Sequence, residues 1–252
     1  MQTLTPLAIN YLLENCEIGL PGRYADSPLV ERVWHSQSDN GGSFISEAKS
    51  NWQIVVSKYQ RETVVTIHGP ETRATSAHTP SNAEFTGIIF KAGVFMPKFP
   101  AGMVMDRRDL NLPQAGSNFF WLDSSAWELP NFQNAESFVT RLVREGLLVH
   151  DPLVEVALRE QPSLLSRRTI QRRFLQATGL TYNKMYQIQR ARYANALLER
   201  GVSILDTVEQ AGYTDQSHLT RALRHFIGQT PAQIFTPSTN EPMSFLFKTP
   251  SF

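Results

Sequence analysis

Residues 215–230 read DQSHLTRALRHFIGQT and residues 166–181 read SRRTIQRRFLQATGLT, so one short unit occurs twice in this chain. The two copies are 49 residues apart. Each begins with a residue that favours a helix N-cap, Ser166 or Asp215. Each then continues in a helical pattern towards a glycine that can adopt the left-handed C-cap conformation. The matching positions are Ile170 with Leu219, Arg172 with Arg221, Phe174 with Leu223, Gly179 with Gly228 and Thr181 with Thr230.

A helical wheel separates an apolar face from a polar face on each predicted helix. The polar faces carry side chains that read base edges in the major groove. Arg can bridge guanine O6 and N7, Gln can pair with adenine, and Ser or Thr can serve either base. The solvated side of an ordinary helical bundle would have a similar composition. The predicted DNA-reading residues are Arg168, Gln171 and Arg172 in the first copy and Gln216, Ser217, Thr220, Arg221 and Arg224 in the second.

A candidate supporting helix precedes each copy. Residues 204–210 predict a helix, and Ala211-Gly212-Tyr213 forms a short turn before the second copy, which is the spacing of a helix-turn-helix. In the first copy, the equivalent helix around Val154 and Leu158 is followed by a longer connection without glycine. We therefore expect that supporting helix to be compressed or displaced, and the docking angle of helix 167–176 stays open.

The segment between the two copies predicts one long helix over residues 182–199. At 1.5 Å per residue it would span ~27 Å. A rod of that length can hold two reading helices about one DNA turn apart, ~34 Å. The same helix would also serve as a core helix of the domain.

The charge distribution indicates an anionic partner for the C-terminal part. The whole chain has a net charge of +1. Residues 1–149 carry 12 Lys/Arg against 15 Asp/Glu, whereas residues 163–235 carry 10 against 4, a net charge of +6. Nucleic acid is the first candidate for such a segment, although a solvated basic face would show the same excess.

The first 150 residues predict a β-rich architecture. Short β-branched or aromatic runs at 53–56, 63–67 and 85–90 are separated by turn clusters such as 68–70 and 78–82. Apolar residues then recur at helical spacing over 138–148, and Asp151-Pro152 predicts the start of a new helix. We therefore predict an α+β chain with three parts: a β-rich, barrel-like domain at 1–150, an all-α domain with two helix-turn-helix units at 151–236, and a tail at 237–252 that is either disordered or docked on the body.

The repeated units resemble the AraC family of bacterial transcription regulators. Residues 166–174 are similar to the family's first recognition helix, and residues 211–221 with 227–231 resemble its second signature. The resemblance covers about residues 152–235. It implies that the predicted reading residues of each copy enter successive major grooves. More faintly, segments 30–34, 68–72 and 87–93 resemble the sensor domains of such regulators, which implies a domain that binds a small molecule or mediates dimerisation.

Other chemistry has little support in the sequence. His35, His68 and His78 could meet in a β-barrel as a metal site, but they lack the close ligand spacing that such sites usually show. Cys16, the single cysteine, lies in an apolar stretch and predicts an inert thiol. Trp52, Trp121 and Trp127 could line an apolar pocket, although core packing is the better interpretation. We find no nucleophile motif or phosphate-binding glycine loop, and we expect neither catalysis nor a cofactor.

The sequence thus predicts a DNA-binding transcription regulator that binds double-stranded DNA. Further candidate partners are a small-molecule effector and RNA polymerase, with the chain acting as a monomer or a homodimer. The alternatives are a metal- or ligand-binding β-barrel enzyme with an appended DNA-binding domain, and a module whose basic helices contact an acidic protein. No apolar stretch reaches the ~20 residues of a membrane helix and no signal peptide is recognisable, so the expected compartment is the cytoplasm.

Overall fold

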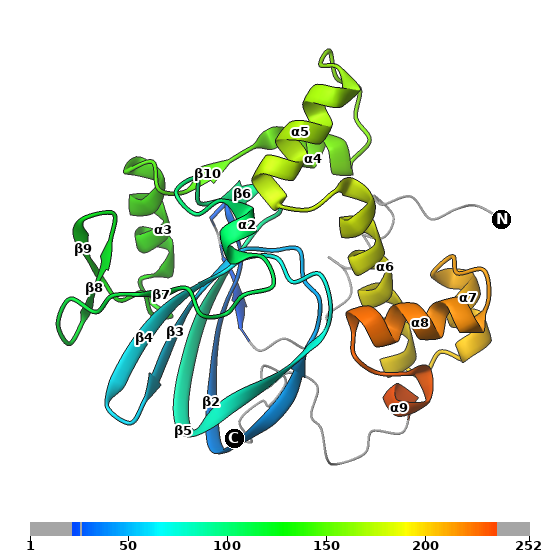
Figure 1. Cartoon of the computed structure of the whole chain (residues 1–252), viewed down its shortest axis with the longest axis horizontal. Helices are drawn as coiled ribbons and strands as arrows, with labels where there is room; N and C mark the ends of the chain where they lie inside the picture. The colour runs from blue at the N-terminus through cyan, green and yellow to red at the C-terminus, as the bar shows by residue number, and fades with distance from the viewer. Residues whose placement is uncertain (1–21, 26, 236–252) are drawn as a thin grey trace.

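The computed structural model of the protein describes residues 22–25 and 27–235 (Figure 1). Strands dominate the first part of the chain and helices the last, which confirms the α+β class. The strands are β1 Arg23–Tyr24, β2 Val30–Ser46, β3 Gln53–Tyr59, β4 Glu62–His68, β5 Thr75–Phe90, β6 Val94–Phe95, β7 Asn111–Leu112, β8 Phe119–Leu122, β9 Ser125–Glu128 and β10 Val149–His150. The helices are α2 Ala101–Val104, α3 Ala135–Arg144, α4 Pro152–Leu158, α5 Arg167–Thr178, α6 Tyr182–Glu199, α7 Ile204–Gln210, α8 Gln216–Phe226 and α9 Pro231–Phe235.

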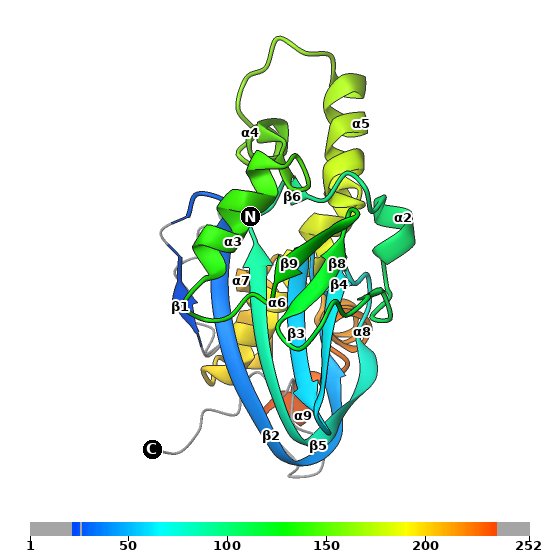
Figure 2. The same cartoon turned by 90° about the vertical axis from the view of Figure 1, so that its left-hand side faces the viewer.

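The N-terminal domain is an open antiparallel sheet rather than the expected barrel. Its six strands lie in the order β1-β2-β5-β3-β4-β7. Figure 2 shows the two long strands, β2 and β5, curving side by side. The terminal strands β1 and β7 have two residues each and, within the described ranges, do not pair with one another. Strands this short cannot supply the continuous ladder that closes a barrel.

The predicted turn at residues 78–82 is wrong, because β5 runs straight through it. Ser81 pairs with Asn40 and Thr79 with Gly42 of β2. Strand β3 pairs with β5 only from Glu84 onwards. The earlier half of β5 therefore has a single neighbour among the described strands, and proline is tolerated at such an edge.

The core of this domain lies on one face of the sheet. Ile54, Val56 and Ile88 point into it, and the β8–β9 hairpin and α3 cover them with Phe120, Trp127 and Phe138. The helical pattern expected over 138–148 ends early, at Arg144, because Gly146 adopts a left-handed φ of +69°. Leu147 and Leu148 are nevertheless buried, as the chain turns back under the helix.

Of the other residues singled out in the sequence, the structure describes some and leaves others outside the described ranges. Cys16 and the tail at 237–252 lie outside the described residues. Trp52 and Trp127 are buried, as core packing requires, whereas Trp121 is exposed on β8. Within residues 22–25 and 27–235, no helix has both the length and the apolar character needed to cross a membrane.

Candidate nucleic-acid interface

Helices α5 and α8 begin at the two predicted N-caps. The Ser166 hydroxyl accepts a hydrogen bond from the Thr169 amide at 3.2 Å, and the Asp215 carboxylate accepts one from the His218 amide at 2.7 Å. Helix α5 ends at Gly179, whose φ of +73° is the expected left-handed C-cap. These local bonds fix where each helix starts, and hence which residues of the repeat lie in its first two turns.

Each of the two helices has a buried side and an exposed side. Leu219, Leu223 and Phe226 anchor α8, while Phe174 and Ala177 anchor α5. Thr220 is half-buried, and the other seven predicted reading residues are exposed: Arg168, Gln171, Arg172, Gln216, Ser217, Arg221 and Arg224. The two sets thus lie on the solvent side of their helices, where an incoming duplex could reach them.

The long helix α6 connects the two units. It spans Tyr182–Glu199, the bounds expected from the sequence, and begins at a Thr181 cap. Figure 1 shows α5 at one end of α6 and the α7–α8 pair at the other. Met185, Ile188 and Leu198 of α6 belong to one buried cluster that also contains Phe174 of α5 and Leu219 of α8. Because a single core holds both units, α6 acts as a rigid spacer between them.

An arginine of α6 contacts the turn of the second unit. Gly212 adopts the left-handed conformation with a φ of +69°. The Arg190 guanidinium donates to the Gly212 carbonyl at 3.4 Å and lies 4.2 Å from the centre of the Tyr213 ring. Burial raises the pKa of Tyr213 to about 12, so the phenol is neutral at physiological pH. Arg190 was missed in the sequence, because α6 also carries Lys184 and Arg192 and no local pattern sets Arg190 apart from them.

The first unit is held together differently. Residues 159–166 connect α4 to α5 and are a longer link than residues 211–215 of the second unit. Instead of a glycine turn, the Asp151 carboxylate binds Arg173 through two hydrogen bonds, of 2.8 Å to Nε and 2.7 Å to Nη2. Asp151 is also the N-cap of α4, accepting from the Leu153 amide at 3.0 Å. This paired interaction anchors α5 to the start of α4.

The sheet domain supports the carboxyl end of α8. The Ala48 amide donates to the Phe226 carbonyl at 2.7 Å, and the Ala74 amide donates to the His225 carbonyl at 2.8 Å. These bonds satisfy two carbonyls that a helix end otherwise leaves unpaired. They contact the end of the helix opposite Gln216 and Ser217, so the predicted reading residues stay exposed.

Glu71 ties together the two loop segments that carry these amides. Its backbone exchanges two hydrogen bonds with Lys49, and its carboxylate forms ion pairs with Lys49, at 2.9 Å, and with Arg108. Although burial opposes ionisation, these two cations lower the pKa of Glu71 to about 2. Glu71 is therefore ionised at physiological pH, and its ion pairs hold together the two loops that bond to the carboxyl end of α8.

A second acidic side chain, Glu47, lies next to α6 in the same region. Its Oε1 is enclosed and has no hydrogen-bond partner in the part of the chain that the structure describes. Burial raises the pKa of Glu47 to about 7; Glu199 adds to this rise, whereas Arg192 and Lys49 oppose it. The contact between sheet and helices thus contains a carboxyl group that titrates near neutrality.

The three N-terminal histidines lie on different strands. His35 of β2 and His78 of β5 are exposed, and His35 contacts the Thr86 hydroxyl at 3.1 Å. Burial, together with the nearby Lys49, lowers the pKa of His68 on β4 to about 3, so this ring is neutral. Across the described ranges, no group of three or more His, Cys, Asp or Glu side chains is arranged to hold a metal ion.

The helical part of the chain is similar in sequence to known proteins. Residues 164–236 match the protein family described as "Helix-turn-helix domain". The HTH-type transcriptional regulator RipA of Corynebacterium glutamicum is 35% identical over 92 residues, which cover 36% of this chain and 28% of that protein. RipA of Corynebacterium diphtheriae is 34% identical over 86 residues, 34% of this chain and 25% of that protein. The chain thus spans only about a quarter of the length of these curated relatives.

A weaker likeness extends over most of the chain. ToxT from Vibrio cholerae matches 81% of this chain and 96% of its own length, with 8% sequence identity and a TM-score of 0.37. A second structure of ToxT, from Vibrio cholerae O395, gives 9% identity and a TM-score of 0.36. These scores are too low to bear on fold or function.

Proposed function

We propose that the protein is a sequence-specific, DNA-binding transcription regulator of the AraC type, because its helical part matches a helix-turn-helix family and is similar to the regulator RipA. In this proposal residues 151–236 bind DNA, residues 1–150 form a domain that binds an effector or mediates dimerisation, and residues 237–252 are a tail. The matched family is a DNA-binding domain rather than an enzyme family.

One observation carries the proposal. Arg172 and Arg221 occupy equivalent positions of the repeat, and both are exposed, while Phe174 and Leu223 on the opposite sides of their helices are buried. Guanidinium groups in this arrangement can reach guanine O6 and N7 from the major groove. The other exposed arginines, Arg168 and Arg224, add phosphate attraction or further base contacts.

Selection of bound sequences from random duplex DNA tests this function. We expect a selected site with two half-sites about one helical turn apart. Arg221→Ala should then cost ~1–3 kcal/mol in binding and relax the preference at one base pair. Arg200, exposed at the C-cap of α6, is the matched control; Arg200→Ala should weaken all sequences alike or have no effect.

Two results would contradict this assignment. The first is unchanged selectivity of Arg221→Ala, and the second is a sequence-selective effect of Arg200→Ala. Salt dependence separates DNA from the alternative acidic protein partner, because phosphate contacts make the logarithm of the binding constant fall steeply with the logarithm of salt concentration. If the binding constant for duplex DNA hardly changed with salt concentration, the acidic protein partner would be favoured.

We further propose that the N-terminal domain binds a small polar effector in a groove beside its core. The groove has a volume of about 560 Å³, within the ~300–1,000 Å³ typical of ligand sites. It opens where the apolar core around Val56 gives way to polar side chains. Strands β2, β3 and β5 form its floor, and the segment 128–133 its wall; the polar lining includes His35, Lys58, Glu84, Thr86, Glu128 and Gln133.

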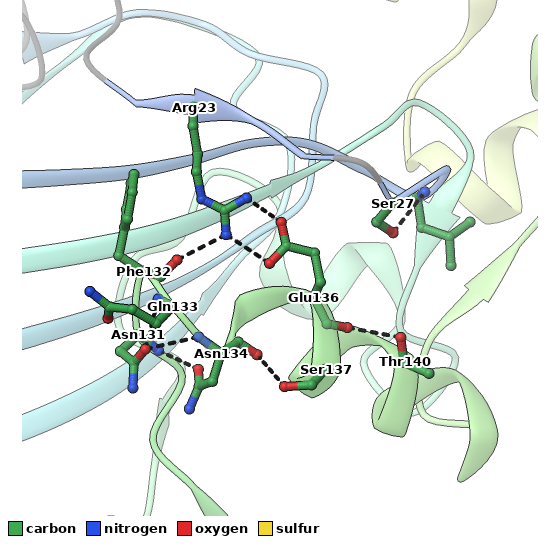
Figure 3. A network of polar contacts seen from close by, with 10 residues as sticks. Arg23, Ser27, Asn131, Phe132, Gln133, Asn134, Glu136, Ser137 and Thr140 are labelled. Carbon is green, nitrogen blue, oxygen red and sulfur yellow. Dashed lines mark hydrogen bonds and ion pairs between the residues drawn. The ribbon is translucent and has the colours of Figure 1, made fainter.

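The wall of the groove is held in place by polar contacts. Figure 3 shows Arg23 paired with Glu136 of α3. The same guanidinium donates to the Phe132 carbonyl at 2.9 Å. The Asn131 side-chain oxygen accepts from the Gln133 amide at 2.8 Å and from the Asn134 amide at 2.9 Å. A wall fixed in this way needs little reordering to accept a ligand, which favours binding.

A thermal-shift screen of polar metabolites tests the effector site. A ligand of this groove should raise the melting temperature of the protein by binding the folded state. The rise should disappear in Lys58→Ala and persist in the control Lys91→Ala, whose exposed side chain does not line the groove. A ligand that stabilises both variants equally binds elsewhere and would refute this placement.

A further inference from the structure

An exposed leucine lies among the predicted reading residues of α5. Leu175 follows Arg168 by seven residues, which on an α-helix brings it back to within about 20° of the same angular position. Its side chain is 48% exposed, while its neighbours Phe174 and Ala177 are 2% and 1% exposed. Leu175 therefore lies on the solvent side of α5, in the stripe formed by Arg168, Gln171 and Arg172.

The fold of α5 does not require an apolar side chain at this position. The buried face of the helix is complete without Leu175, which is absent from the core cluster that contains Phe174 and Ala177. The equivalent residue of the second unit, 49 positions later, is Arg224, which is exposed on α8. The same place in the repeat is thus apolar in one copy and cationic in the other.

The chemistry of leucine restricts what it can recognise in the major groove. Leucine has no hydrogen-bond donor or acceptor in its side chain, so it cannot read a base edge or bind a phosphate as Arg224 can. The apolar group that the major groove offers is the 5-methyl group of thymine. We propose that Leu175 is a specificity-determining residue that packs against the methyl group of a thymine in the half-site bound by the first unit. This inference rests on the proposed function as a DNA-binding regulator.

The two half-sites are then chemically different. Arg172 and Arg221 occupy the same position of the repeat and read an equivalent guanine in each half-site. Leu175 adds a thymine preference to the first half-site only, because Arg224 replaces it in the second unit. The chain therefore binds its full site in one orientation, with α5 on the half-site that carries the thymine.

Replacing thymine by deoxyuridine removes the methyl group and leaves base pairing intact. We would measure the affinity of the full-length protein for the selected duplex with each thymine replaced in turn. The wild-type protein should lose affinity about fourfold at one thymine of the half-site that also responds to Arg172→Ala, which is the effect of exposing one methyl-sized group. Leu175→Ala should bind the unmodified duplex about as weakly as wild type binds that deoxyuridine duplex, and should not respond to the replacement.

Leu205→Ala is the matched control. Leu205 is 73% exposed on α7, outside the reading stripes, so its replacement should leave both affinity and the deoxyuridine response unchanged. Because both leucines are exposed, neither variant should unfold the domain. Equal melting temperatures would verify this.

The outcomes separate this inference from the function it rests on. If no sequence is selected from random DNA, the proposed function fails and the inference fails with it. If a site is selected but no deoxyuridine replacement loses its effect in Leu175→Ala, the thymine contact alone is refuted. The latter result is also what an exposed leucine that contacts a protein partner, such as RNA polymerase, would give.

Discussion

The Asp151 carboxylate has two structural roles, and suitable substitutions can measure each of them. Its Oδ1 accepts from the Leu153 amide at 3.0 Å and from Arg173 Nη2 at 2.7 Å, and its Oδ2 accepts from Arg173 Nε at 2.8 Å. The first bond caps α4, a local role. The other two connect α4 to α5 across 22 residues of sequence. Asp151→Ala removes both roles, whereas Asp151→Asn keeps an oxygen for the cap and loses the charge.

The expected magnitudes follow from the two contacts. Loss of an N-cap side chain costs about 1 kcal/mol. The Arg173 side chain is 40% exposed, so solvent screening limits its ion pair to about 0.5–1 kcal/mol despite the two-bond geometry. We expect Asp151→Ala to lower the free energy of unfolding by about 2 kcal/mol and Asp151→Asn by about 1 kcal/mol or less. A double-mutant cycle with Arg173→Ala should give a coupling energy of about 0.5–1 kcal/mol.

Urea unfolding followed by circular dichroism measures these differences, with binding to the selected duplex as a second readout. Because Arg173 fixes α5 rather than reading bases, Arg173→Ala should weaken binding chiefly through the first half-site. Equal destabilisation by Asp151→Ala and Asp151→Asn, or a coupling energy of zero, would refute the conclusion that this ion pair replaces the missing glycine turn.

Two further predictions concern the contact between the sheet and the helices. The folded-state pKa of Glu47 is about 7, above its ordinary value of 4.5, so its contribution to stability is complete below pH 4.5 and is lost as the pH rises through 7. The free energy of unfolding of Glu47→Gln should not show this loss, and the variant should be more stable than wild type at pH 8. If the variant's free energy of unfolding varied with pH as that of wild type does, the assignment would be contradicted. A Cβ atom at Gly228 would lie 2.6 Å from Ile45 Cγ2, whereas one at Gly201, which has a similar positive φ, has open space. Amide exchange at Ala48 should therefore speed up in Gly228→Val but not in Gly201→Val, and equal rates in the two variants would show that this contact does not hold α8.

Much of the helical domain could be predicted because its signals are local. The bounds of α6 and α7, the caps Ser166 and Asp215, and the left-handed Gly179 were all expected. Capping bonds join residues two or three apart, and helical periodicity acts over a few turns, so a short stretch contains the information. The same reasoning assigned the exposed sides of α5 and α8, although which of their residues touch DNA stays a prediction.

The sheet domain was harder to predict because its outcome depends on distant partners. The cluster at 78–82 has the composition of a turn, yet pairing with β2 extends β5 through it. Whether the sheet closes depends on the lengths of β1 and β7, which have few local signals. The helical spacing of apolar residues continues after Arg144, but the helix ends there, before Gly146. Leu147 and Leu148 are buried by tertiary packing instead of by a continued helix.

From the amino-acid order one can read the repeated unit, its caps, its amphipathic faces and the arginines at equivalent positions. Folding in three dimensions added the Asp151–Arg173 anchor, the Ala48 and Ala74 bonds to the end of α8, and the groove beside the sheet core. The physical reason is sequence separation. A bond between neighbours forms wherever the local conformation allows it, whereas a contact across tens of residues exists only after the packing of the whole chain has brought its partners together.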